Sequence, residues 1–179
     1  MRFRSLTLAV AATCALAVPG LTDSIMPYAG QESQMIKALS DDDISPLLKG
    51  EGMGFAKAAE LNGYPGPKHV LDLADRLKLT PDQRQQIRAI FDKMSAAAKP
   101  LGAELVARER QLDRLFQKSE ITHDRLARET AAIADLQGHL RSVHLAAHLE
   151  TKAVLSAEQN ALYEQLRGYD DMLTMHHHG

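Results

Sequence analysis

Leu-Thr-Pro-Asp-Gln at residues 79–83 and Leu-Ser-Ala-Glu-Gln at residues 155–159 share one form and lie 76 residues apart. In each stretch the hydroxyl side chain can accept a hydrogen bond from the backbone N–H three residues later, and the Gln side chain can return the bond. Proline in the first stretch takes the first helical position, where its missing N–H costs nothing. Both stretches therefore predict helix starts. The residues of this paired motif are Leu79, Thr80, Gln83, Leu155, Ser156 and Gln159.

Between these two starts the apolar residues recur at spacings of three and four, which is typical of a long helical hairpin. We expect helices over 81–118 and 123–154, joined by a turn at 119–122. Pro100 lies within the first helix and should kink it, or split it near Ala96. Shorter helices are expected to flank the hairpin over 33–49, 53–61, 67–78 and 157–167.

The second long helix carries two apolar stripes. Leu145 and Leu149 fall on nearly the opposite side from the inner stripe, since each residue advances a helix by about 100°. They are predicted to contact a further helix, a second subunit or a client protein. The inner stripe consists of Leu126, Ile133, Leu136, Leu140, Val143, Ala147 and Val154.

The first residues have the pattern of a secretory signal peptide. Arg2 and Arg4 precede an apolar run over 6–18 that is too short to span a membrane. Small residues at Ala15 and Ala17 predict cleavage after Ala17. We therefore expect an exported, periplasmic protein that retains no membrane span.

Composition excludes several classes of function. Removal of residues 1–17 would take away Cys14, and it would leave 19 basic residues (21 minus Arg2 and Arg4) against 23 acidic ones, a net charge near −4. This balance argues against a nucleic-acid partner. No cysteine nucleophile would remain, and no Gly-x-Ser-x-Gly, phosphate loop or His-Glu-x-x-His occurs, so we expect no enzyme.

His144 and His148 are four residues apart on one predicted helix, so their imidazoles share a face. Such a pair is a half-site for Zn(II), Cu(II), Ni(II) or Co(II). A complete site would need His123, a carboxylate such as Glu150, or groups from a second chain. The alternative is that both histidines sit at the edge of an interface and are hydrogen-bonded to neighbours.

The C-terminal tail is rich in potential metal ligands. Histidine and methionine are intermediate and soft donors, so the tail could hold copper or zinc weakly. The alternatives are a remnant of a purification tag and a solvated tail without a role. The candidate ligands are Met172, Met175, His176, His177 and His178.

The paired Leu-[Thr/Ser]-x-x-Gln stretches, behind a signal peptide and around a helical hairpin, resemble the Spy/CpxP family of periplasmic proteins. Residues 59–67, 144–148 and 163–169 look like its branch of heavy-metal-resistance sensors, such as CnrX and ZraP. The resemblance covers 67–169. It implies an all-α, cradle-like homodimer of bent hairpins. It also implies ATP-independent chaperoning of unfolding envelope proteins, restraint of a membrane sensor kinase, or metal sensing.

These observations lead to one domain plan and one expected function. We expect a signal peptide (1–17), an N-terminal segment with short helices (18–66), the hairpin domain (67–169) and a His/Met-rich tail (170–179). The expected function is that of a periplasmic stress-response protein that binds or senses heavy-metal ions and requires no other cofactor. The alternative is a holdase chaperone, or a regulator of a sensor kinase, without metal dependence.

Overall fold

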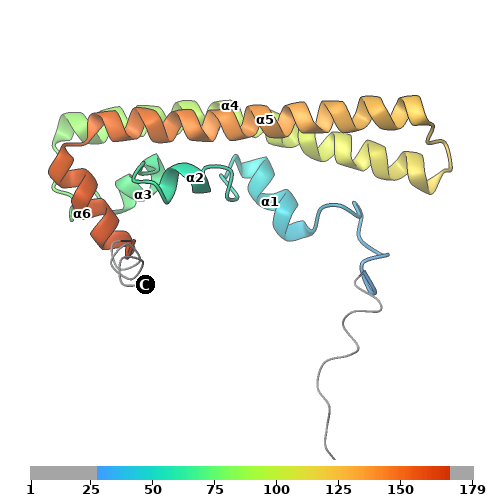
Figure 1. The fold of residues 1–179 in the computed structure, drawn as a ribbon, viewed down its shortest axis with the longest axis horizontal. Helices are drawn as coiled ribbons and strands as arrows, with labels where there is room; N and C mark the ends of the chain where they lie inside the picture. Colours follow the sequence, from blue (N-terminus) through green and yellow to red (C-terminus); the bar gives the residue numbers. More distant parts are fainter. Residues whose placement is uncertain (1–27, 170–179) are drawn as a thin grey trace, which may run out of the picture. The chain divides into compact units, whose positions relative to one another are not determined.

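The computed structural model describes residues 28–169, and this part of the chain is helical, with no β-sheet (Figure 1). Its helices all belong to one unit, which begins at Gln34. The predicted all-α class is confirmed, and no helix in this range is long and apolar enough to cross a membrane. The helices are α1 (Asp41–Lys49), α2 (Lys57–Glu60), α3 (Pro67–Asp72), α4 (Pro81–Gln117), α5 (His123–Val154) and α6 (Ala157–Arg167).

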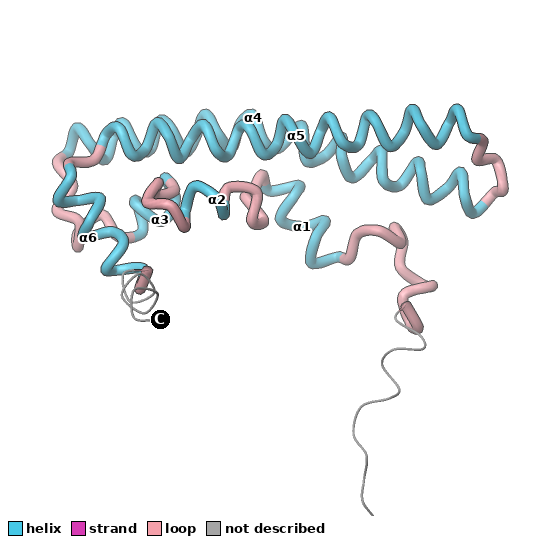
Figure 2. The backbone as a smooth tube through the Cα atoms, viewed as in Figure 1, coloured by secondary structure: helices cyan, strands magenta, loops and turns pink. Residues whose placement is uncertain are grey.

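Helices α4 and α5 form the predicted hairpin, and a short turn joins them (Figures 1 and 2). Thr122 ends this turn and caps α5, because its side chain accepts a hydrogen bond from the N–H of Arg125 at 3.3 Å. Leu126 departs from the predicted inner stripe: it lies in the first turn of α5, outside the core clusters, and is 36% exposed. The buried members of the stripe are Ile133, Leu136, Leu140 and Ala147.

Pro100 does not split α4, which runs unbroken from Pro81 to Gln117. The split near Ala96, one of the two expected effects of Pro100, is therefore wrong. Proline removes one backbone N–H and leaves the carbonyl of the residue four positions earlier without its helical partner. Both Pro100 and Ala96 are exposed, so water can satisfy this carbonyl and the helix can continue.

Helix α1 occupies only 41–49 of the stretch 33–49, and it begins at Asp41, the start that the pairing of Ser40 with Asp43 three residues later predicts for a capped helix. The Ser40 side chain accepts from the N–H of Asp43 at 3.2 Å, and the Asp43 carboxylate accepts from the N–H of Ser40 at 3.0 Å. The last turn of α1 lies directly against α4. A Cβ atom on Gly102 would overlap the backbone carbonyl of Leu47, so this approach requires glycine.

The two capping boxes form as predicted. Thr80 accepts from the N–H of Gln83 at 3.2 Å, and the Gln83 side chain accepts from the N–H of Thr80 at 3.1 Å. Ser156 and Gln159 repeat the arrangement at 3.2 and 2.9 Å. Helices α4 and α6 therefore start where the sequence placed them.

The two boxes are also joined to each other. The amide of Gln83 donates to the side-chain oxygen of Gln159 at 2.8 Å, and the amide of Gln159 donates back at 3.0 Å. Gln83 also donates to the carbonyl of Val154, and Gln159 donates to that of Leu77. This Gln83–Gln159 clasp ties the start of α4 to the end of α5 and the start of α6.

The leucine that precedes each box has a packing role. Leu79 and Leu155 are 5% and 7% exposed and belong to one core cluster at the base of the hairpin. Val70 of α3 and Tyr163 of α6 complete its centre. The paired motif therefore supplies both the polar clasp and part of the core beneath it.

Candidate metal centre

His144 and His148 lie one turn apart on α5, and both are buried within the described chain. Their exposed fractions are 2% and 9%. Residues 50–67, which connect α1, α2 and α3, cross this face of α5 and bring Gly52 next to the His144 ring and Gly66 next to the His148 ring. The helical periodicity placed both histidines on one face, but it did not show that a loop covers that face.

The ring of His148 is oriented by the backbone. Its Nδ1 lies 2.7 Å from the carbonyl oxygen of Tyr64, which can only accept, so Nδ1 carries the proton. In the neutral ring Nε2 is then left with a free lone pair. Gly66 lies beside this atom: a Cβ on Gly66 would be 3.0 Å from Nε2. The absence of a side chain at Gly66 leaves room next to the lone pair.

His144 is buried without a polar partner. Its Nε2 has no hydrogen bond within the described residues, and its ring stacks on Phe55 with centroids 6.1 Å apart. Burial lowers the pKa of His144, and the neighbouring His148 lowers it further, so the ring is neutral near pH 7. Gly52 lies over the other nitrogen, where an added Cβ would sit 3.5 Å from Nδ1. A neutral, unpartnered imidazole is a ready metal ligand.

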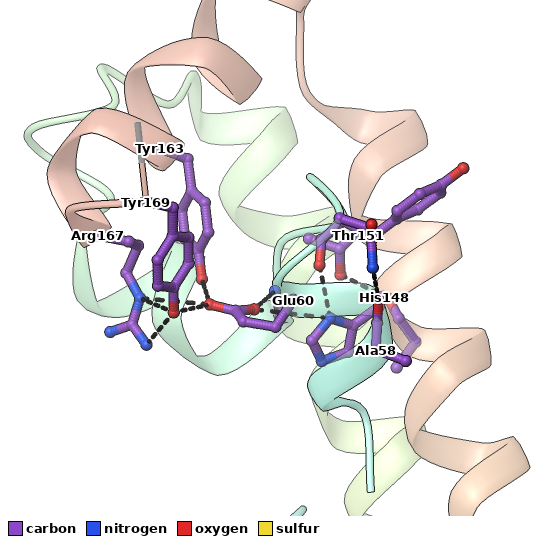
Figure 3. A network of polar contacts seen from close by, with 11 residues as sticks. Ala58, Glu60, His148, Thr151, Tyr163, Arg167 and Tyr169 are labelled. Carbon is purple, nitrogen blue, oxygen red and sulfur yellow. Dashed lines mark hydrogen bonds and ion pairs between the residues drawn. The ribbon is translucent and has the colours of Figure 1, made fainter. Parts of the chain in front are cut away.

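Behind His148 lies Glu60, which is the centre of a polar network (Figure 3). Its Oε1 accepts from the hydroxyls of Tyr163 at 2.6 Å and Tyr169 at 3.1 Å, and it pairs with Nε of Arg167 at 3.3 Å. Arg167 also donates to the Tyr169 hydroxyl. Burial, followed by the hydrogen bond to Glu60, raises the pKa of Tyr163 far above its usual value.

The second oxygen of Glu60 faces the histidine. Its Oε2 accepts from the N–H of Gly66 at 3.1 Å and lies 3.7 Å from Nδ1 of His148 (Figure 3). Glu60 thus holds the loop that orients the ring and places a negative charge behind it. A carboxylate and a carbonyl next to the protonated nitrogen are the usual supports of a metal-binding histidine.

A cavity of about 770 Å³ lies against both histidines. Helix α5 contributes His144 and His148, helix α4 contributes Met94, and the loop after α1 contributes Met53. We call this space the histidine cavity, defined by these four residues and Glu60.

The structure does not supply the third ligand that the sequence suggested. His123 starts α5, and 21 residues of helix place it about 30 Å from His144 in the same chain, so it cannot complete the site there. Glu150 pairs with Lys93 at 3.0 Å. Within residues 28–169, no three His, Cys, Asp or Glu side chains are grouped to hold a metal ion. The tail ligands, Met172, Met175, His176, His177 and His178, lie outside the described residues.

Sequence reasoning missed Glu60. Residues 59–67 and 163–169 stood out only by resemblance, and nothing local in the sequence indicated that they meet. The bond from Tyr163 to Glu60 joins residues 103 positions apart.

The described chain is an all-α hairpin with a buried histidine pair on its second helix, and a comparison with protein families identifies the family to which it belongs. Residues 58–161 match the model of the heavy-metal resistance family, and this match covers more than half of the chain. The chain belongs to that family. Searches of curated proteins and of solved structures found no significant match.

Proposed function

We propose that this protein is a periplasmic stress-response protein that binds heavy-metal ions at His144 and His148. The observation that carries the proposal is the hydrogen bond from Nδ1 of His148 to the Tyr64 carbonyl, which leaves Nε2 free beside Gly66. Membership of the heavy-metal resistance family and the predicted signal peptide support it. Its role is binding rather than catalysis.

The two imidazoles favour metal binding for different reasons. His148 is held in one orientation by Tyr64 and Glu60, so little rotational freedom is lost when an ion binds. His144 has a buried nitrogen without a partner in the described range, which carries a desolvation cost in the free protein. An ion that takes this lone pair removes the cost. Both donors must be neutral, so protons compete with the metal.

Titration calorimetry with Zn(II), Cu(II), Ni(II) and Co(II), and with Ag(I) as a monovalent ion, tests the proposal. The background is the protein with His176, His177 and His178 replaced by alanine, so that tail binding does not mask the cavity. His148→Ala and His144→Ala should each weaken binding of the preferred ion at least about tenfold. His139→Ala is the control, because this histidine is exposed and pairs only with Asp135 in the described range. Equal affinities in all variants would contradict the proposal.

A second function, ATP-independent chaperoning without metal dependence, is favoured by the exposed apolar surface of the hairpin. Leu149 is 58% exposed and Leu145 is half-buried. A groove of about 220 Å³ between α4 and α5 is lined mainly by apolar residues. This surface suits either unfolded envelope proteins or the second copy of a homodimer. Suppressed aggregation of a denatured client, lost in Leu149→Ser, would support it; unchanged light scattering would exclude it.

If a membrane sensor protein is the partner, the bound ion would act through the loop that covers α5. Residues 50–67 include Glu60 and contact both histidines, so metal binding and the position of this loop are linked. A sensor that recognises this loop would bind the metal-free and metal-loaded protein with different affinity. Equal affinity of both forms for the sensor would rule out this route of signalling.

A further inference from the structure

Two thioether side chains share the histidine cavity with the two imidazoles. Met94 on α4 is 9% exposed, and Met53 in the loop after α1 is 41% exposed. No three His, Cys, Asp or Glu side chains are grouped to hold a metal ion in the described range, yet methionine sulfur is also a metal donor. The cavity therefore offers two nitrogen and two sulfur donors, all neutral.

Met53 is held in an unusual backbone conformation. Its φ is +41°, in the left-handed region that side chains other than glycine rarely adopt. The turn around it is tight, because the N–H of Phe55 donates to the carbonyl of Gly52 at 2.6 Å. Glycine would relieve the strain, and Gly52 and Gly54 flank the position. Strain of this kind gathers at binding sites, which favours a role for the methionine side chain.

The charges around the cavity disfavour a divalent ion. Of the two lining glutamates, Glu60 already has its charge stabilised by two tyrosines, Arg167 and Gly66. Lysines outnumber glutamates in this wall within the described residues, even when Lys68 is left out because it pairs with Asp72 at 2.8 Å. A doubly charged ion bound by neutral donors would meet this excess of positive charge at close range. A singly charged ion would be repelled about half as strongly. The charged lining residues are Lys49, Lys57, Lys68, Lys99, Glu51 and Glu60.

We propose that the histidine cavity selects a soft monovalent ion, Cu(I), which His144, His148 and Met94 bind together, with Met53 at the mouth. Thioether and imidazole donors suit Cu(I), and their neutrality matches its single charge. The inference rests on the proposed function, and it names the metal of that same site. The unpartnered Nε2 of His144 and the sulfur of Met94 then become ligands of one ion.

Competition against a chromophoric Cu(I) chelator tests the selection, with Ag(I) as a monovalent probe that does not oxidise in air. The background again lacks the tail ligands, with Met172 and Met175 replaced by leucine and the three tail histidines by alanine. Met94→Leu should weaken Cu(I) and Ag(I) binding at least about tenfold and change Zn(II) binding less than twofold. Leucine keeps the volume of methionine, so the fold is retained. Met35→Leu is the control, since Met35 is 70% exposed and does not line the cavity.

X-ray absorption of the Cu(I)-loaded protein gives a second readout. A sulfur scatterer in the first coordination shell, absent in Met94→Leu, supports the inference. If Zn(II), Ni(II) or Co(II) binds through the histidines while Cu(I) binds no better, or if Met94→Leu and Met53→Leu leave Cu(I) affinity unchanged, the inference is overturned and the proposed function survives. If no ion binds through the histidines, both are overturned.

Discussion

Gln83 and Gln159 exchange two side-chain hydrogen bonds, of 2.8 and 3.0 Å, across 76 residues of sequence. Each glutamine also accepts from the N–H of its own N-cap residue. A capping box needs only one such residue at one helix start. The exchange explains why the motif occurs twice: the two boxes are halves of one structural element.

We predict that the clasp stabilises the fold cooperatively. Gln83→Ala and Gln159→Ala should each lower the free energy of unfolding by about 1–3 kcal/mol, because partly buried donors and acceptors lose their partners. The double variant should cost about 1 kcal/mol less than the sum, since the shared bonds can be lost only once. Urea denaturation measures all three, with the exposed Gln86→Ala as control. Additive effects would show that the two boxes act independently.

Two glycine-to-alanine substitutions in the long helices should change the free energy of unfolding in opposite directions, because only one of the glycines lies at the contact of α1 with α4. Gly138→Ala in α5 meets nothing within 4 Å and should stabilise the protein by about 0.5–1 kcal/mol, because alanine favours helix more than glycine. Gly102→Ala should destabilise it by about 1–3 kcal/mol, since the new methyl overlaps the Leu47 carbonyl. Thermal unfolding measures the stability of both variants. Equal stabilisation by the two substitutions would mean that α1 does not pack against α4 at Gly102.

Tyr163 predicts a pH dependence on the alkaline side. Its pKa is raised in the folded protein, from 10.0, by burial and by Glu60. Above about pH 10 the unfolded chain loses this proton while the folded protein keeps it, so stability falls by up to about 1.4 kcal/mol per pH unit. Below pH 10 the contribution of Tyr163 to the free energy of unfolding is fully present.

Tyr163→Phe should lower the free energy of unfolding by about 1.5–3 kcal/mol at pH 7, because the hydrogen bond to Glu60 is lost. Above pH 10 the difference in this free energy between wild type and variant should become smaller. Denaturant midpoints at pH 7 and pH 11 measure both. Tyr28→Phe is the control, because Tyr28 is 75% exposed. A gap that stays constant with pH would contradict the assignment.

Gly66→Ala should block the metal centre without removing a ligand. Gly66 has φ −81°, which alanine adopts freely, so the backbone tolerates the change. The new Cβ would lie 3.0 Å from Nε2 of His148 and should weaken metal binding at least about tenfold. Gly52→Ala, whose Cβ would make an ordinary 3.5 Å contact with His144, should have a smaller effect. Calorimetry compares the two, and an unchanged affinity in Gly66→Ala would exclude Nε2 as a ligand.

Local signals made most of the fold predictable. The caps at Thr80, Thr122 and Ser156 set the starts of α4, α5 and α6, because an N-cap depends on residues within one turn. The predicted split of α4 at Pro100 was wrong, because the cost of a proline inside a helix depends on whether water can reach the freed carbonyl. Sequence alone does not show that exposure.

The site was predictable only in part. Spacing placed His144 and His148 on one face, but their burial depends on a loop whose path is set by distant contacts. Glu60 was not found, because its partners Tyr163, Arg167 and Tyr169 lie more than 100 residues away in the chain. Single-sequence patterns do not report such contacts.

The most direct test of the metal centre is NMR of the histidine rings, with labelled nitrogen, in protein whose tail histidines are alanine. In the metal-free protein the neutral form of the His148 ring should carry its proton on Nδ1. On addition of Zn(II) or Ag(I), the resonances of Nε2 in His148 and of the His144 ring should shift together, while His139 stays unchanged. A neutral His148 ring with its proton on Nε2 would contradict the account. So would ring resonances of His144 and His148 that do not shift when either ion is added.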